Sequence, residues 1–191
     1  MKMINRKFAS SAAAVFAASM LAVASSTAMA AVVCASPNLD VPSDISGVYL
    51  NLVTGDTSGG AGWDINPYNN NVGLTFYGAA SPSGILATGS PGVTAETVVL
   101  ASGDAVSPTP APNFYNQFQT RGTSFQTAGT RFLGVKFMNE GTATMNYGWV
   151  EMISGAAAGF PATIARYCYD DTGAAITAGT TPVSLQSYSI D

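Results

Sequence analysis

Residues 131–171 place the tightest constraint on the fold, because they hold three runs of strand-forming residues parted only by short turns. In the first run, residues 133–137, every second residue is large and apolar, which is the period of two of a half-buried strand. Residues 147–150 alternate in the same way, and residues 162–169 form the third run. The pattern predicts an antiparallel meander of three strands around which the chain is organised.

The register of the first hairpin can also be predicted. A turn over residues 139–143 would place Leu133 opposite Trp149, with both side chains on one face of the sheet. Arg131 would then lie opposite Glu151, as a cross-strand pair of opposite charges.

The chain before the meander indicates shorter strands separated by turn signals. The candidate strands are residues 48–53, 72–77, 85–88 and 97–100. Residues 31–46 contain prolines and little periodicity, so an irregular segment is expected there. Several short strands with turns between them predict an all-β fold, an antiparallel β-sandwich of jelly-roll-like organisation.

The N-terminus has the order of a secretory signal peptide. Lys2, Arg6 and Lys7 precede an apolar, alanine-rich run, and small residues ending at Ala30 form an A-x-A cleavage pattern. A retained membrane anchor is the alternative, but the apolar run is shorter than the roughly 20 residues that span a bilayer. We therefore expect a signal peptide over residues 1–30 and a single domain over residues 31–191.

The charge balance excludes a nucleic-acid partner. The sequence has 7 basic and 11 acidic residues, a formal net charge of −4, and the leader contains three of the basic residues. No basic cluster is present that would bind a phosphate backbone. No second apolar run follows the leader, so no membrane span is expected after cleavage.

The chain has two cysteines, Cys34 and Cys168. In the oxidising compartment that a signal peptide implies, they can form one intramolecular disulfide. Free thiols and an intermolecular bond are the alternatives.

Several motifs resemble the core of bacterial exported proteins of the PEP-CTERM type. They are FLGVKF at residues 132–137, YGWV at 147–150, ARYCYD at 165–170, ITAG at 176–179 and WDINPY at 63–68. The resemblance implies a secreted β-sandwich, usually of unassigned function, with no catalytic residues to carry over. The sorting tail of that group does not follow Asp191, which predicts release rather than surface anchoring.

The chemistry available to the chain is narrow, because it has no histidine. That excludes Ser-His-Asp and Cys-His catalysis and histidine-ligated metals, and no phosphate-binding glycine motif is present. A glycan-active enzyme would have to use carboxylates, with Glu96 and Glu151 as candidates. Turn or surface positions are the alternative explanation for these acids, as they are for Glu140.

Calcium is the one metal considered, and no other cofactor is expected. Asp56, Asp64 and Asn66, with the asparagines at 69–71, place many oxygen ligands in a glycine-rich region. The spacing does not match a calcium-binding loop, and Asp and Asn are also ordinary turn residues.

Aromatic residues in or beside the predicted loops are the candidate ligand-binding residues. They are Trp63, Tyr68, Tyr77 and Tyr115, with Phe114 beside them. Their rings could stack on a sugar; the alternative is that they close the ends of the core.

These observations predict a secreted, non-enzymatic β-sandwich with a structural or interaction role at the cell surface or in the matrix. Its expected partners are extracellular polysaccharide or other surface proteins. A carbohydrate-binding module is the first alternative, and a carboxylate-based glycan-active enzyme is the second.

Overall fold

The structure, a computed structural model, describes residues 32–91, 95–108, 113–117 and 119–182. The signal peptide predicted for residues 1–30 lies outside the described residues.

Most of the described chain is in strands. The elements in chain order are β1 (Val32–Ala35), β2 (Leu39–Val41), β3 (Ile65–Asn69), β4 (Leu74–Gly78), β5 (Gly84–Thr88), β6 (Glu96–Thr97), β7 (Ala105–Val106), β8 (Phe114–Tyr115), β9 (Gln119–Arg121), the 3-10 turn η1 (Thr123–Phe125), β10 (Gly129–Asn139), β11 (Thr144–Gly155), β12 (Gly159–Asp170) and β13 (Ile176–Thr177). The described residues contain no α-helix. The all-β prediction is confirmed.

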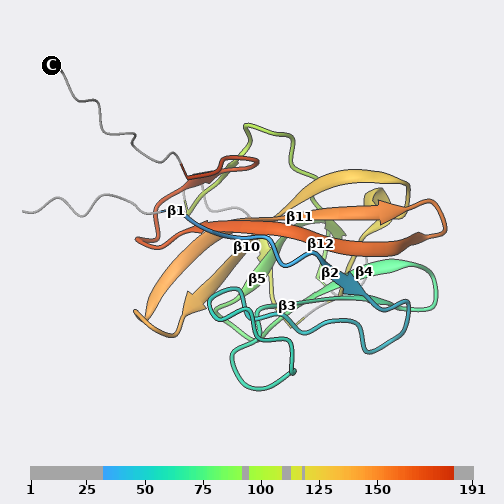
Figure 1. Cartoon of the computed structure of the whole chain (residues 1–191), viewed down its shortest axis with the longest axis horizontal. Coiled ribbons are helices and arrows are strands. Elements are labelled where there is room, and N and C mark those ends of the chain that lie inside the picture. The colour runs from blue at the N-terminus through green and yellow to red at the C-terminus, as the bar shows by residue number, and fades with distance from the viewer. Residues whose placement is uncertain (1–31, 92–94, 109–112, 118, 183–191) are drawn as a thin grey trace, which may run out of the picture.

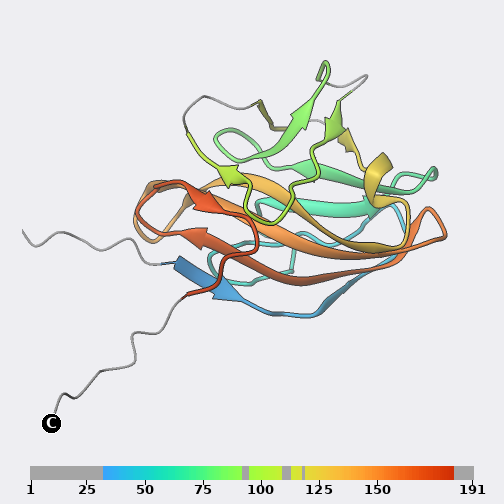
Figure 2. The same ribbon diagram turned by 90° about the horizontal axis from the view of Figure 1, so that it is seen from above.

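Eleven of the described strands form one continuous sheet, in the order β1-β12-β11-β10-β5-β6-β9-β4-β3, with β2 paired to β12 and β8 paired to β5. The pairings are antiparallel except for the contact between β6 and β9. The predicted meander is present as the long strands β10, β11 and β12, which cross the molecule in Figure 1. Strands β1 and β2, drawn in blue, follow its outer edge in Figure 2.

Strand β5 connects two layers of this sheet. Ile85 pairs with Val135 of the meander, and two residues later Ala87 pairs with Thr97 of β6. Strands β6, β9, β4 and β3 then form the second layer. The Leu74 N–H donates to the carbonyl of Ala158, in the turn between β11 and β12, at 2.8 Å, so the layers also meet at their far end.

The main core consists of apolar side chains from both layers and from the segment before β3. The largest of its fully buried members are Phe76, Phe125, Phe137, Leu50, Leu52, Ile65, Leu74, Ile85, Leu133, Met152 and Ile164. Burial of these side chains is the main source of stability of the fold.

A second apolar cluster covers the opposite face of the meander. Its buried members are Leu100, Val106, Trp149, Cys168, Ile176 and Ala178. The Trp149 ring meets Phe132 edge to face, with centroids 5.2 Å apart, and the two-stranded sheet of β7 and β13 supplies Val106 and Ile176. The meander is therefore buried on both faces.

The predicted hairpin register is wrong by one residue. Leu133 lies opposite Val150, and Trp149 lies opposite Gly134, so Leu133 and Trp149 belong to different faces. The turn is shorter than expected: Asn139 pairs with Thr144, its carbonyl accepts the Ala143 N–H at 2.7 Å, and its side chain accepts the Gly141 N–H at 2.9 Å.

Three upstream predictions also need correction. The segment expected to be irregular contains β1 and β2, held by pairing to β12. The expected strand at residues 48–53 makes only isolated bridges at Tyr49 and Leu50, although the Leu50 N–H donates to Ile65 at 2.9 Å and adds to the edge of β3. Strand β3 itself falls in a stretch with no predicted strand.

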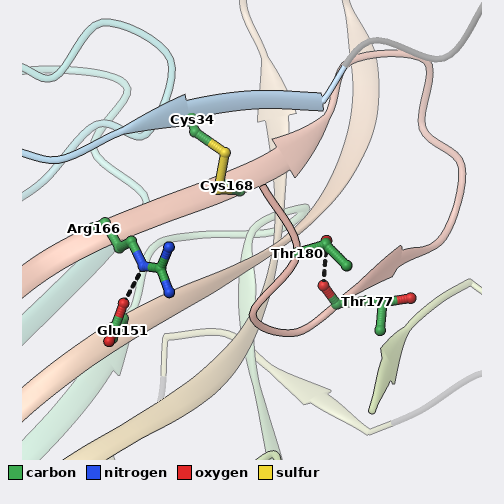
Figure 3. The surroundings of a disulfide bond; sticks show 6 residues. All are labelled: Cys34, Glu151, Arg166, Cys168, Thr177 and Thr180. Atoms are coloured by element: carbon green, nitrogen blue, oxygen red, sulfur yellow. Dashed lines mark hydrogen bonds and ion pairs between the residues drawn. A yellow bond between two sulfur atoms is a disulfide. The ribbon is translucent and has the colours of Figure 1, made fainter. Parts of the chain in front are cut away.

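The predicted disulfide is confirmed. Cys34 of β1 and Cys168 of β12 are directly opposite in the ladder, with Cα atoms 4.1 Å apart, and they are joined across a sequence separation of 134 (Figure 3). The bond ties an edge strand near the start of the described chain to the last long strand. Structural disulfides are typical of proteins in oxidising compartments.

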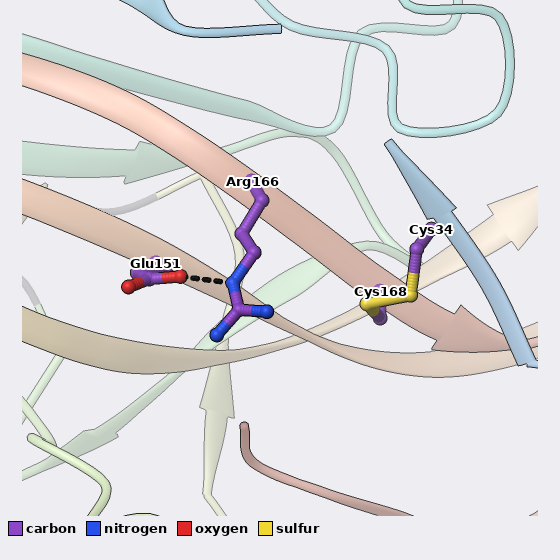
Figure 4. Close-up of polar contacts among 4 residues, drawn as sticks. All are labelled: Cys34, Glu151, Arg166 and Cys168. Carbon is purple, nitrogen blue, oxygen red and sulfur yellow. Dashed lines mark hydrogen bonds and ion pairs between the residues drawn. A yellow bond between two sulfur atoms is a disulfide. The ribbon is translucent and has the colours of Figure 1, made fainter. Parts of the chain in front are cut away.

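The predicted cross-strand pair of Arg131 and Glu151 is wrong, because the observed register of β10 and β11 is shifted by one residue. Arg131 lies opposite Met152, and its guanidinium donates to the Thr127 carbonyl at 2.9 Å. Glu151 instead forms an ion pair with Arg166, its cross-strand neighbour on β12 (Figures 3 and 4). The Arg166 guanidinium also lies over the Trp149 ring, 5.2 Å from its centroid, and so covers the second cluster.

Replacing both cysteines by serine should lower the free energy of unfolding by about 2–5 kcal/mol, because the unfolded chain would lose the restraint of a very long loop. Denaturant unfolding of the variant and of the parent protein would measure this, and the reduced parent should match the variant. Equal unfolding midpoints for oxidised parent and variant would contradict the expectation.

A double-mutant cycle tests the register directly. Glu151→Gln combined with Arg166→Gln should give a coupling free energy of about 0.5–1 kcal/mol, as for a partly exposed cross-strand ion pair. The matched cycle of Glu151→Gln with Arg131→Gln should give a coupling near zero. The reverse result would support the register predicted from the sequence.

Candidate ligand-binding site

The second layer buries one face of its strands and leaves the other available. In β4, Leu74 and Phe76 point into the core, whereas Thr75 and Tyr77 alternate with them on the outer face, where Thr75 is fully buried and Tyr77 is half-buried. Cross-strand pairing places Tyr68 of β3 beside Thr75, on the same face.

Four aromatic rings gather at this outer face. Trp63, two residues before the start of β3, meets Tyr49 edge to face with ring centroids 5.0 Å apart, and its centroid lies 6.2 Å from that of Tyr77. Tyr68 completes the group, and all four rings are half-buried. The Tyr77 hydroxyl donates to the carbonyl of Gln117 at 3.0 Å, which fixes that ring.

Two neighbouring clefts use these rings as walls. The aromatic cleft has a volume of about 320 Å³ and is lined by Ile45, Tyr49, Trp63, Asn66, Tyr68 and Tyr77. The acidic cleft has a volume of about 410 Å³ and is lined by Gly62, Trp63, Asp64, Tyr77, Ala79, Ala80, Pro82, Ser83, Gln117, Met138 and Glu140. Trp63 and Tyr77 line both clefts, so they form one shared wall.

Asp64 holds this wall in position. Its carboxylate accepts the Leu52 N–H at 2.9 Å and the Ser83 hydroxyl at 3.0 Å. Its backbone donates to Leu50 and accepts from Ala79, both at 2.9 Å. Asp64 therefore joins the segment before β3, the end of β4 and the turn before β5 beside Trp63.

Burial, with the side chain only 2% exposed, raises the pKa of Asp64 to about 7, and the neighbouring Glu140 carboxylate acts in the same direction. The two hydrogen bonds from Leu52 and Ser83 oppose this shift without cancelling it. Near neutral pH, Asp64 is thus divided between its protonated and ionised forms.

Glu140, in the β10–β11 turn, closes one side of the acidic cleft. The Asn51 side chain donates to the Gly62 carbonyl at 2.6 Å and to Glu140 Oε1 at 3.4 Å. A Cβ on Gly62 would lie 2.7 Å from Glu140 Oε1, so a glycine at this position lets the carboxylate approach. The meander and the second layer therefore both contribute to the cleft.

The residues considered for calcium have separate partners. The exposed Asp56 accepts from the hydroxyl and N–H of Ser58, which lower its pKa. Asp64 binds Leu52 and Ser83, and the Asn66 side chain donates to the Ser46 carbonyl at 3.1 Å. Within the described residues, no group of three or more acidic or cysteine side chains that could hold a metal is present.

Three of the four predicted aromatic ligand residues are brought together, and the fourth is not. Trp63, Tyr68 and Tyr77 all line the aromatic cleft. Tyr115 lies on β8, where its hydroxyl donates to the Gly89 carbonyl at 2.5 Å, and it lines neither cleft. Its neighbour Phe114 packs on the second cluster, with its ring centroid 5.9 Å from that of Tyr147.

The two candidate catalytic glutamates are not brought together at these clefts. Glu151 pairs with Arg166 on the meander, while Glu96 of β6 accepts the Thr123 hydroxyl at 3.1 Å. The acids that line a cleft are Asp64 and Glu140 instead. The sequence contained no signal for this pair, because the contact joins positions far apart in the chain. Tyr49 was missed because it was assigned to a strand.

The comparisons with known proteins give no significant match to a family model, a curated protein or a solved structure. The part of the chain that the structure describes contains no helix with the length and apolar character of a membrane span.

We call the hydrogen bonds that join Asp64 to Leu50, Leu52, Ala79 and Ser83 the Asp64 clasp. The substitution Asp64→Asn tests this clasp through the pH dependence of the free energy of unfolding. Between about pH 4 and pH 7 the unfolded chain releases this proton while the folded protein keeps it, so the parent protein should lose stability with rising pH. An asparagine side chain would keep one acceptor for the Leu52 N–H and does not titrate, so the variant should lack this loss. The loss amounts to at most about 4 kcal/mol, since one pKa unit corresponds to about 1.4 kcal/mol.

Urea unfolding of both proteins at a series of pH values measures the effect. The stability difference between them should change through this window and stay constant above about pH 7. A difference that is the same at pH 4 and pH 8 would show that Asp64 has an ordinary pKa.

Proposed function

We propose that this protein is an exported, non-enzymatic binding protein that attaches to extracellular polysaccharide through the wall formed by Trp63 and Tyr77. One observation carries the proposal: these half-buried rings line two adjacent clefts instead of packing into either apolar cluster. Aromatic rings with an apolar face and a polar edge suit sugars, which offer both C–H faces and hydroxyl groups.

The polar groups around the rings support the same ligand class. Binding sites for small molecules combine apolar walls with a few placed polar groups. Here Gln117, Ser83 and Glu140 lie beside the rings in the acidic cleft, and Asn66 lies beside them in the aromatic cleft.

Binding is favoured over hydrolysis by the environment of Asp64. Both carboxylate oxygens of Asp64 accept hydrogen bonds from the protein, and the side chain is 2% exposed. A general acid has to reach the glycosidic oxygen of its substrate, and Asp64 is instead engaged in holding the fold. This supports a binding role for the acidic cleft.

Export is supported by the leader pattern of residues 1–30, by the disulfide, and by the resemblance to exported proteins of the PEP-CTERM type. In the extracellular space, a polysaccharide-binding protein would take part in a surface layer or matrix.

A retention assay on insoluble cellulose, chitin, xylan, mannan and β-1,3-glucan tests this proposal. The parent protein should be retained on at least one polymer, and Trp63→Ala should weaken that retention by about tenfold or more because the shared wall is lost. Tyr115→Ala is the matched control, since it removes an aromatic residue outside the clefts. Melting curves check that both variants fold. Equal retention of parent and Trp63→Ala would contradict the proposal.

A further inference from the structure

The outer face of the second layer continues beyond the aromatic cleft. Cross-strand pairing places Arg121 of β9 beside Thr75, which in turn lies beside Tyr68. The adjacent row consists of Gln119 and Tyr77. Side chains in such rows share one sheet face. A polar region therefore lies next to the aromatic rings on this face.

That polar region is hollowed. A third cleft, the polar cleft, has a volume of about 400 Å³, and its lining includes Asn70, Thr75, Gln119, Arg121, Thr123 and Gln126. Amide, hydroxyl and guanidinium groups therefore replace rings as the lining. Such groups match the hydroxyl and ring oxygens of a sugar.

Arg121 is the cation of the polar cleft, and its guanidinium makes no ion pair or hydrogen bond within the described residues. Glu96 is its Cα partner on the neighbouring strand, and that carboxylate accepts from Thr123. The two charges roughly balance at this end of the face, while Glu140 adds a negative charge at the other end. A strongly anionic polymer would find little net attraction here.

The three clefts lie in series along β4 and the residue that follows it. Ala79 lines the acidic cleft, Tyr77 lines the acidic and aromatic clefts, and Thr75 lines the polar cleft. At about 3.3 Å per residue of extended chain, Ala79 and Thr75 are roughly 13 Å apart. Only a ligand of several sugar rings can reach from one end to the other.

A peptide added as a strand does not suit this face. Strand β4 is paired on both sides, to β3 and β9, so its backbone donors and acceptors are already used. Recognition on this face has to use side chains, and those present are rings followed by amides, hydroxyls and one guanidinium.

We propose that the occupant is a linear, uncharged glycan chain that runs along the outer face of β4, with sugar rings against Trp63 and Tyr77 and hydroxyl groups against Gln119 and Arg121. This inference rests on the proposed polysaccharide binding and adds the ligand's length, its charge and a second contact region.

The test uses oligosaccharides of two to six residues prepared from the polymer that retains the protein, with titration calorimetry as the measurement. Affinity should rise about fivefold to tenfold from the disaccharide to the hexasaccharide, as expected from one or two added hydrogen bonds. Arg121→Gln should remove most of that gain and leave disaccharide affinity unchanged. Arg131→Gln, which removes the same charge from the meander, should behave as the parent protein.

The outcomes separate this inference from the proposed function. Equal affinities across the length series, or no effect of Arg121→Gln, would overturn the extended site while Trp63→Ala could still abolish binding. If the protein binds polygalacturonate more tightly than any neutral polymer, and salt weakens that binding, the inference that the ligand is uncharged is overturned. If no polymer retains the protein, both the proposed function and this inference are contradicted.

Discussion

Burial of the meander on both of its faces determines where the rest of the structure lies. Leu133 and its alternate neighbours face the main core, and Trp149 faces the second cluster. Because both faces are covered, each strand carries large apolar residues at consecutive positions, and alternation alone no longer specifies which face is which. The turn decides the register instead: the Asn139 carbonyl accepts two backbone N–H groups of its own hairpin, its side chain accepts a third, and these bonds set the loop length.

The second layer packs against the core through only one of its faces, and this makes it suitable for a binding site. It contacts the core through one face, with Leu74 and Phe76 fully buried, and its other face carries Tyr77 and Thr75. Folding of that layer depends on the buried inward residues, and Thr75 is also fully buried, whereas the half-buried Tyr77 can change with less loss of stability. A rigid, doubly covered meander thus supports a layer whose free face is available for recognition.

The sequence predicted the features that depend on local pattern or on simple pairing. The meander, the all-β fold and the Cys34–Cys168 bond were all predictable. The hairpin register was not predictable, because both faces of the meander are buried and Trp149 could therefore lie on either face. Strand β3 was missed because asparagines and Pro67 conceal its alternation, and it is held by pairing to β4. At the site, Trp63, Tyr68 and Tyr77 were identified from residue type, whereas Glu140 reaches the cleft only through the packing of the meander turn against Gly62.

The position of Trp63 depends on hydrogen bonds more than on apolar packing. A buried carboxylate costs desolvation free energy, which the bonds from Leu52 and Ser83 offset only in part, since the pKa of Asp64 remains raised. An apolar residue could fill the same space at lower cost, but it could not join three separate segments at fixed distances. The net stabilisation from such a clasp is small, and its effect is geometric. These hydrogen bonds hold the Trp63 ring at the boundary of the two clefts. Without them, burial in the apolar core would be more favourable for a tryptophan.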